Sequence, residues 1–350
     1  MSEMWSSEML FPTFGRVIRI SWLDELLAHN FDTQSFELTA RFIFVVGCIG
    51  ACAVIWHFAP LPVREKKAAV AAGVVHFLLA SSIELFVMSQ GVYNYIIQKQ
   101  MLWDVPFDIH LGWAALWGAG LCMGWRSVRG VWKPILVAGA IGATLAMDFA
   151  ALGTGQIFTP LTPLWWLWDL GALVVLALST LAFFKLVLEH HALYFRAAVY
   201  GVGYGFIFYL LLPAMILTLS RSRNNLTVIL NPLSLAALAI CSLPGLIAAF
   251  QFATNGNGSP LPLDPTRKLV TNGIYAYVRN PMQISGVCAA IVWAVTAQSW
   301  FLWIYVFDLA VLLTLTKIFE DRELAERFGS EFDRYRTHVW CWLPRLTPYH

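Results

Sequence analysis

Long apolar stretches separated by short polar segments recur along most of the chain. A helix that spans a bilayer needs about 20 mostly apolar residues. The last two stretches lie closer together than the others, which predicts a helical hairpin. The pattern predicts an all-α, polytopic integral membrane protein with about nine transmembrane helices. The predicted spans are Phe42–Ala59, Ala68–Met88, Ile109–Trp125, Ile135–Leu152, Leu164–Leu188, Ala197–Leu219, Leu226–Ala253, Met282–Ala297 and Phe301–Ile318.

Composition agrees with this pattern. Of the 350 residues, 59% are hydrophobic and 13% are charged, whereas about a quarter are charged in soluble domains. The net charge of +2 gives no indication of a polyanionic partner such as a nucleic acid. No cleavable signal peptide is evident in the first 40 residues. Residues Trp22–His29 have one apolar side and predict a short interfacial helix.

Basic residues in the loops predict an orientation. Lys and Arg cluster in four segments, and cytoplasmic loops carry an excess of these residues. The charged C-terminal tail is then expected in the cytoplasm, as for a multi-pass protein of a bacterial inner membrane. Segment 221–225 disagrees, because it carries two arginines on the opposite side. The four segments are 64–67, 126–133, 185–196 and 267–279.

The composition changes near residue 195, which predicts two domains, 1–194 and 195–350. The first domain contains Trp-rich spans, and we interpret it as a membrane domain of undefined role that could form a substrate chamber. In the second domain, a segment rich in Pro, Gly and Asn (255–265) precedes a polar hook, residues 267–286 ("RKLVTNGIYAYVRNPMQISG"), which leads into the hairpin.

The hook has the chemistry of a ligand site. Gly273 and Pro281 bracket a short turn whose backbone needs hydrogen-bond partners from protein or ligand, because lipid offers none. A hairpin returns to the side from which it starts, so Glu320 and Asn280 are expected at the same membrane level. Carboxylates, an arginine, an amide and tyrosines would converge there. Such a site suits a zwitterionic, aromatic and cationic ligand.

The order of these pieces resembles a known family. "GSPLPLDPTRKLVTNGIYAYVRNP", a short hairpin, "EDREL" and "FGSEFDRYRTHV" are similar to the membrane methyltransferases related to isoprenylcysteine carboxyl methyltransferase and the phospholipid methyltransferases. The resemblance covers about residues 195–350 and is strongest from Gly258 onward. It implies an S-adenosylmethionine-dependent methyltransferase that acts on a lipid or hydrophobic small molecule, which enters from the bilayer.

The resemblance also implies a set of site residues. It implies that Arg279 and Glu320 act in catalysis. Two residues depart from the family pattern Arg-His-Pro-x-Tyr, because Asn280 replaces the histidine and Gln283 replaces the tyrosine. The loss of that tyrosine puts one aromatic wall of the pocket in doubt. The implied cofactor-binding residues are Lys268, Leu269, Val270, Tyr275, Asn280, Pro281, Met282, Gln283 and Glu320.

The same family suggests how to interpret the methyl acceptor. Members that methylate a carboxylate place an arginine one helical turn before the glutamate that matches Glu320. Here that position is Thr316, and Lys317 is expected to point away, since adjacent residues on a helix are about 100° apart. We therefore expect an uncharged acceptor group.

Simpler interpretations remain for the same residues. Arg279 could be an interfacial anchor, and Tyr275 and Tyr277 could belong to the aromatic belt. Glu320 with Asp321 could be a solvated helix end. The six cysteines have no metal-ligand spacing, and we interpret them as small core residues, with no metal site.

The first domain contains acids within its predicted spans, which are functional candidates by default. Glu84, Asp148 and Asp169 could be catalytic or could form interhelical hydrogen bonds. "ELFVMSQGVYNY", "WDVPFDIHLGWA" and "AMDFAALGTGQ…PLWWLWD" faintly resemble the membrane carotenoid hydratase and lycopene cyclase group. That resemblance implies Glu84, Asp108 and Asp148 as proton donors to a polyene. A bifunctional isoprenoid-modifying enzyme and a non-catalytic transporter or scaffold are therefore the alternatives.

Overall fold

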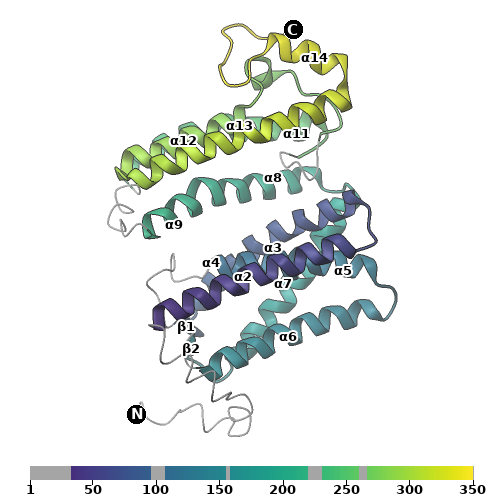
Figure 1. Cartoon of the computed structure of the whole chain (residues 1–350), viewed down its shortest axis with the longest axis vertical. Helices are drawn as coiled ribbons and strands as arrows, with labels where there is room; N and C mark the ends of the chain where they lie inside the picture. The colour runs from purple at the N-terminus through teal and green to yellow at the C-terminus, as the bar shows by residue number, and fades with distance from the viewer. Residues whose placement is uncertain (1–32, 96–106, 155–157, 220–230, 260–265, 350) are drawn as a thin grey trace. The chain divides into compact units, whose positions relative to one another are not determined.

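The computed structural model describes residues 33–95, 107–154, 158–219, 231–259 and 266–349. These residues are almost entirely helical (Figure 1). They form two compact units, one within Met1–Pro60 and Leu79–Ser179 and the other within Leu61–Leu78 and Thr180–His350. The division falls inside two long helices. The domain boundary near residue 195 stays a prediction, and the predicted interfacial helix Trp22–His29 lies outside the described residues.

The described elements are named here in chain order. Two segments, η1 and η2, are π-helical insertions within longer helices, and η4 is a single 3₁₀ turn. The elements are α2 (Thr33–Phe58), α3 (Val63–Ser89), β1 (Tyr93–Tyr95), α4 (Phe107–Trp113), η1 (Ala114–Gly120), α5 (Leu121–Ser127), α6 (Trp132–Thr154), β2 (Phe158–Pro160), α7 (Trp165–Leu188), α8 (Leu193–Tyr204), η2 (Gly205–Leu211), α9 (Leu212–Leu219), α11 (Pro232–Gly256), η4 (Gly273–Ala276), α12 (Pro281–Ala297), α13 (Trp300–Phe328) and α14 (Ser330–His338).

The all-α, polytopic fold is confirmed, whereas the count of nine spans is not. In the described part of the chain, six helices are long and apolar enough to cross a membrane. The expected span Met282–Ala297 is present as the shorter apolar helix α12. The six are Arg41–Phe58, Val63–Ser89, Trp165–Leu188, Leu193–Leu217, Pro232–Gly256 and Trp300–Phe328.

The first unit combines its helices with one small β-ladder. Strands β1 and β2 pair antiparallel, with Tyr93 opposite Pro160. A charged pair lies between α2 and α4, where the Arg41 Nε donates to Asp108 Oδ2 at 2.9 Å. Asp108 is therefore engaged in an ion pair with Arg41 within the first unit.

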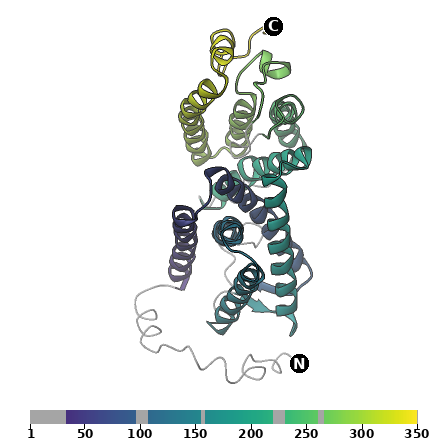
Figure 2. The same cartoon turned by 90° about the vertical axis from the view of Figure 1, so that its right-hand side faces the viewer.

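The second unit contains the predicted helical hairpin. Helices α12 and α13 lie side by side, and α11 packs along α12 (Figures 1 and 2). Pro281 occupies the first position of α12, where its missing N–H costs no helical hydrogen bond. Gln298 takes a left-handed conformation and ends α12, and Gly329 separates α13 from α14 with a positive φ of 52°. The predicted hairpin is confirmed, and helix α14 follows it.

Candidate functional site

The turn at the centre of the hook rests on α11. Ile274 donates its backbone N–H to Gln251 Oε1 at 3.1 Å. Gly273 has a φ of +61°, and a Cβ there would lie 2.0 Å from Gln251 Nε2. Glycine is therefore required by both conformation and space. The turn places the Tyr275 ring parallel to Phe252, with ring centroids 4.9 Å apart.

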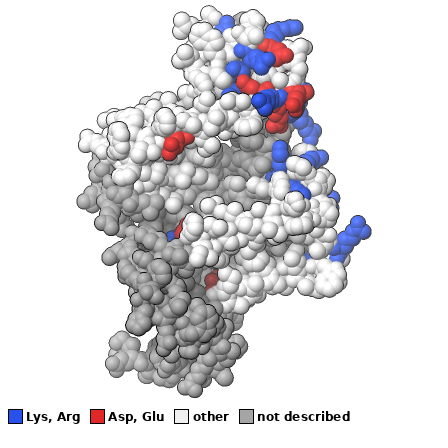
Figure 3. Space-filling view, viewed as in Figure 1, with Lys and Arg blue, Asp and Glu red and all other residues white. Residues whose placement is uncertain are grey.

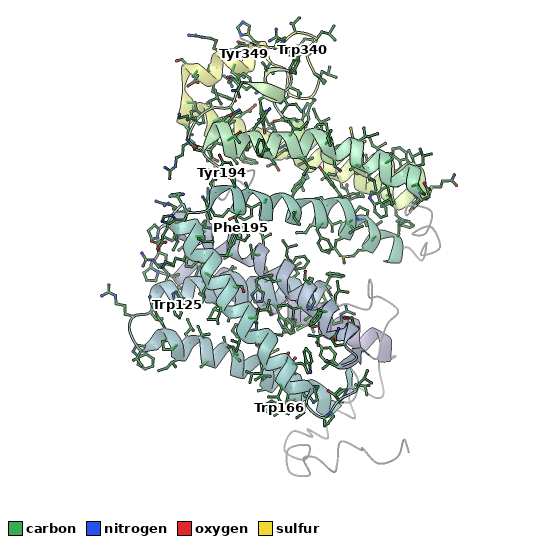
Figure 4. All side chains as sticks on the ribbon, turned by 180° about the vertical axis from the view of Figure 1, so that it is seen from behind. Trp125, Trp166, Tyr194, Phe195, Trp340 and Tyr349 are labelled. Carbon is green, nitrogen blue, oxygen red and sulfur yellow. The ribbon has the colours of Figure 1, made fainter. Side chains whose placement is uncertain are left out.

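The C-terminal tail, residues 339–349, covers the hook. Tyr335, at the end of α14, donates its hydroxyl to the Tyr275 carbonyl at 2.7 Å. Figure 4 shows Trp340 and Tyr349 above the hairpin helices, at the top of the view. Backbone hydrogen bonds between the hook and the tail also fix the hook against residues more than 60 positions later in the chain. The backbone bonds are Arg279 N–H to Trp340 O at 3.0 Å, Arg345 N–H to Tyr277 O at 2.8 Å, and Tyr349 N–H to Ala276 O at 2.9 Å.

Four charged side chains meet where the hook faces the end of α13. Arg279 Nη1 lies 3.3 Å from Asp321 Oδ2. Lys317 Nζ lies 2.9 Å from Asp321 Oδ1 and 3.4 Å from Glu320 Oε2. Figure 3 shows acidic and basic side chains gathered over this end of α13 and over α14, beside a broad uncharged surface. We expected the hairpin to return the Glu320 region to the level of the hook. The Arg279–Asp321 contact meets this expectation.

The expected directions of Thr316 and Lys317 were wrong. Lys317 is buried, with 6% of its surface exposed, and its ammonium joins the charged group. Thr316 is exposed and donates its hydroxyl to Leu312 O of its own helix at 2.8 Å. Lys317 and Asp321, four residues apart, lie on the side of α13 that faces the hook. The sequence did not reveal which side of the helix this would be. Thr316 therefore gives no indication of an uncharged acceptor.

The apolar residues that the resemblance implies for cofactor binding lie in two hydrophobic clusters of the structure. Val270 and Met282 pack with Tyr275, whereas Leu269 packs under the tail beside Tyr335. The Lys268 side chain is exposed, and its backbone N–H bonds to Gly256 O.

The end of the hook also contacts a cysteine. Asn280 is buried, with 6% of its surface exposed, and donates to Cys341 Sγ at 3.2 Å. Arg279 Nη2 donates to the same sulfur at 3.3 Å. Cys341 is half-buried, so our interpretation of this residue as a simple core cysteine was wrong.

Several buried polar atoms of the site have no hydrogen-bond partner among the described residues. They are the Tyr275 hydroxyl, Gln283 Oε1 and Arg279 Nε. Burial raises the pKa of the Tyr275 phenol well above its ordinary value, and the neighbouring Tyr335 and the Glu320 carboxylate add to this effect. The phenol is therefore neutral at physiological pH. A buried polar atom without a partner costs about 1–3 kcal/mol, so these atoms suit a ligand that would supply the missing bonds.

Sequence reasoning missed three contributors to this site. Lys317 had a local signal, its i,i+4 spacing to Asp321. Phe252 and Cys341 had none, because α11 and the tail reach the hook only through the fold.

The site lies almost entirely within one segment that matches a known family. Residues 237–331 match the family model of phospholipid methyltransferases. The matched segment runs from α11 through the hook and the hairpin to the start of α14. This match confirms the resemblance seen in the C-terminal part of the sequence and supports a membrane methyltransferase. Comparisons with curated proteins and with solved structures found no match, and nothing in these comparisons supports the faint resemblance of the first domain.

The acids of the first unit form a separate cluster. Glu84 is buried, with 8% of its surface exposed, and accepts a hydrogen bond from the Tyr93 hydroxyl at 2.7 Å. Asp148 Oδ2 and Asp169 Oδ2 are both buried and have no hydrogen-bond partner among the described residues.

Proposed function

We propose that this protein is an integral membrane methyltransferase that uses S-adenosylmethionine to methylate a lipid or another hydrophobic small molecule. One observation carries the proposal. The segment that matches the phospholipid methyltransferases is the segment in which opposite charges and unpaired buried polar atoms converge. An interfacial anchor would have no need of a buried phenol without a partner.

The residues present fit this cofactor. S-Adenosylmethionine, when bound, supplies a methyl group that its sulfonium has already activated. The site offers cationic and anionic side chains, Lys317 and Glu320 among them, for the two ends of a zwitterion. The Tyr275 hydroxyl and Gln283 Oε1 would bond to the polar groups of the cofactor. Val270 and Met282 would pack against its apolar parts.

The roles of individual side chains follow from their positions. Glu320, with its partner Lys317, would bind the amino-acid portion of the cofactor and offset its positive charge. Arg279 is held between Asp321 and Cys341, and would orient the hook against α13. The tail covers the hook and would exclude water, and transfer reactions gain from such alignment and exclusion. In this proposal the cofactor enters from the cytoplasm and the acceptor enters from the bilayer.

Binding of the cofactor tests the site assignment. In detergent, without added metal, calorimetric titration should show binding of S-adenosylmethionine. Glu320→Ala and Asn280→Ala should each weaken it by about 1–3 kcal/mol, because each removes a polar contact. Glu326→Ala is the matched control, since Glu326 is exposed on the same helix. Unchanged titration curves for both site variants would contradict the assignment.

The acceptor can then be identified directly. Membranes that contain the protein are incubated with methyl-labelled S-adenosylmethionine, and the labelled lipid is extracted and identified by mass spectrometry. Membranes with Glu320→Ala serve as the control. Labelling that is equal in the two membranes would show that the protein is not its source.

A second candidate is a bifunctional enzyme whose first domain modifies an isoprenoid. The buried Oδ2 atoms of Asp148 and Asp169, which have no partner among the described residues, favour it, because a buried carboxyl group can act as a general acid. A host that produces polyenes should then accumulate a hydrated or cyclised product, and Asp148→Asn should abolish it without loss of cofactor binding. A transporter or scaffold is disfavoured by the presence of Tyr275, Arg279, Pro281 and Glu320 together.

A further inference from the structure

The helix α8–η2–α9 leaves two backbone carbonyls without donors from its own backbone. In the π-helical segment η2, the Leu212 N–H bonds to Ile207 O, five residues back. The next donor along the helix would be residue 213, which is a proline and has no N–H. The carbonyls of Phe208 and Tyr209 therefore need partners from elsewhere. π-Helical insertions of this kind are frequent at functional sites.

The hairpin supplies both partners. Trp293 of α12 donates its indole N–H to Tyr209 O at 2.7 Å. Tyr305 of α13 donates its hydroxyl to Phe208 O at 3.0 Å. The π-helical turn is thereby fixed to both helices of the hairpin. Its side chains keep a defined position relative to α12.

This arrangement brings two tyrosine hydroxyls to α12, one helical turn beyond the cofactor residues. A Cβ at Gly286 would lie 3.1 Å from the Tyr204 hydroxyl and 4.0 Å from the Tyr209 hydroxyl. The absence of a side chain at Gly286 allows this close approach. Met282, which packs with Tyr275, precedes Gly286 by four residues and lies on the same side of the helix. The two phenol groups therefore lie beside α12, one helical turn beyond the candidate cofactor site and closer to the apolar part of the helix.

The surroundings of the phenols are polar but uncharged. Tyr209 is hydrogen-bonded to Ser285, whose hydroxyl donates to Cys241 O. The Tyr204 hydroxyl has no hydrogen bond to another residue of the described chain, and its ring contacts Phe208 and Tyr209. Helices α11 and α12 and segment η2 contain no Lys, Arg, Asp or Glu, and Asp308 of α13 is exposed. A charged group here would lose its hydration without gaining a counter-charge, whereas a hydroxyl could be satisfied.

We propose that the Tyr204 and Tyr209 hydroxyls bind the methyl acceptor, and that the acceptor is an uncharged, hydroxyl-bearing molecule with a long apolar tail. This inference rests on the proposed function, because it treats the position beyond Met282 as the acceptor position. Tyr204 and Tyr209 recognise the acceptor hydroxyl, and the missing side chain of Gly286 allows both phenols to reach α12. Tyr305 and Trp293 position the turn and do not contact the acceptor.

A photoreactive C20 prenyl alcohol, with a diazirine on its tail, tests this proposal. The full-length protein in lipid nanodiscs is irradiated with the probe, and the labelled peptides are identified by mass spectrometry. We expect labelling of the α8–η2–α9 and α12 peptides. The unlabelled alcohol should displace the probe about ten-fold better than its methyl ether, its carboxylate analogue or its ammonium analogue, since these lack a neutral donor.

Variants complete the test. The double variant Tyr204→Phe, Tyr209→Phe should lose this preference for the alcohol, while Tyr194→Phe, an exposed tyrosine on α8, should retain it. Gly286→Ala, whose Cβ would displace the Tyr204 hydroxyl, should reduce labelling and serves as an independent second variant. Labelling of other helices only, or equal competition by a charged analogue, would overturn the proposal. Cofactor titration of the same samples separates the two proposals, because the Phe variants should bind S-adenosylmethionine as the wild type does.

Discussion

At the scale of single residues, the second unit contains polar groups that its own fold leaves unsatisfied. The Tyr275 hydroxyl is the clearest, because Tyr275 is only 3% exposed and its hydroxyl has no partner in the described chain. The Asp321 carboxylate, in contrast, has its partners within the protein, because Arg279 and Lys317 both pair with it. These two features predict different responses to mutation.

Removing the Tyr275 hydroxyl should separate stability from binding. Tyr275→Phe eliminates a buried polar atom without a partner, so the cofactor-free protein should be unchanged or more stable by up to about 1 kcal/mol. Affinity for S-adenosylmethionine should fall by about 1–3 kcal/mol. Because the raised pKa keeps the phenol neutral below pH 10, the difference should not vary between pH 6 and 9. Thermal unfolding and calorimetric titration measure the two effects, and a less stable variant with full affinity would contradict this role.

Two neighbouring residues of α13 should behave differently when mutated. Lys317→Ala leaves the Asp321 carboxylate with one cation fewer in a partly buried site, and should destabilise the protein by about 1–3 kcal/mol. Thr316→Val removes only a bond to the same helix, and should change stability by less than about 0.5 kcal/mol. Equilibrium unfolding in detergent measures both. Equal effects would mean that Lys317 does not contribute to the charged group as described.

At the scale of elements, the hook depends on the tail more than on its own sequence. The tail provides three main-chain hydrogen bonds, and Tyr335 of α14 provides a fourth through its hydroxyl. The cluster of Phe332, Tyr335 and Val339 packs against Leu269 of the hook. The 3₁₀ turn alone is too short to hold Tyr275 in place.

Deleting residues 340–350 should therefore abolish cofactor binding without unfolding the transmembrane helices. The helical content by circular dichroism should change little, because α11, α12 and α13 remain complete. Tyr335→Phe is a milder variant and should weaken binding partially. Leu346→Ala is the control, since Leu346 is fully exposed. Full cofactor affinity in the truncated protein would show that the tail does not position the hook.

At the scale of the whole molecule, the membrane fold is clear, while its orientation rests on loop charges. Six helices of the described chain can span a bilayer by length and composition. The basic residues of segments 64–67 and 126–133 predict that the site faces the cytoplasm. That prediction can be tested independently of any activity.

Cysteine labelling measures this orientation. In a background that lacks the native cysteines, Ser127→Cys and Ser330→Cys should react with a membrane-impermeant thiol reagent only after the cytoplasmic side is opened. Both serines are exposed in the structure. The cysteine-free parent should remain unlabelled, and it should be tested for cofactor binding because Cys341 contacts Arg279 and Asn280. Labelling of either position in intact cells would reverse the orientation.

The sequence by itself determined the features that depend on local spacing. Apolar stretches of spanning length predicted the helices, and the closeness of the last two predicted the α12–α13 hairpin. The order of polar motifs in one short segment predicted the family resemblance, whereas the roles of Tyr275 and Asn280 stay predictions. These features are encoded by neighbours in the chain, so a linear reading finds them.

Only the tertiary structure decided which side chains meet. It turned Lys317 toward the site and Thr316 away, because the facing of α13 depends on its packing. It also brought Phe252 and Cys341 to the hook from distant elements, and joined η2 to the hairpin through Trp293 and Tyr305. Such contacts depend on crossing and rotation of helices, and periodicity within one apolar helix does not specify these when nearly every position is hydrophobic.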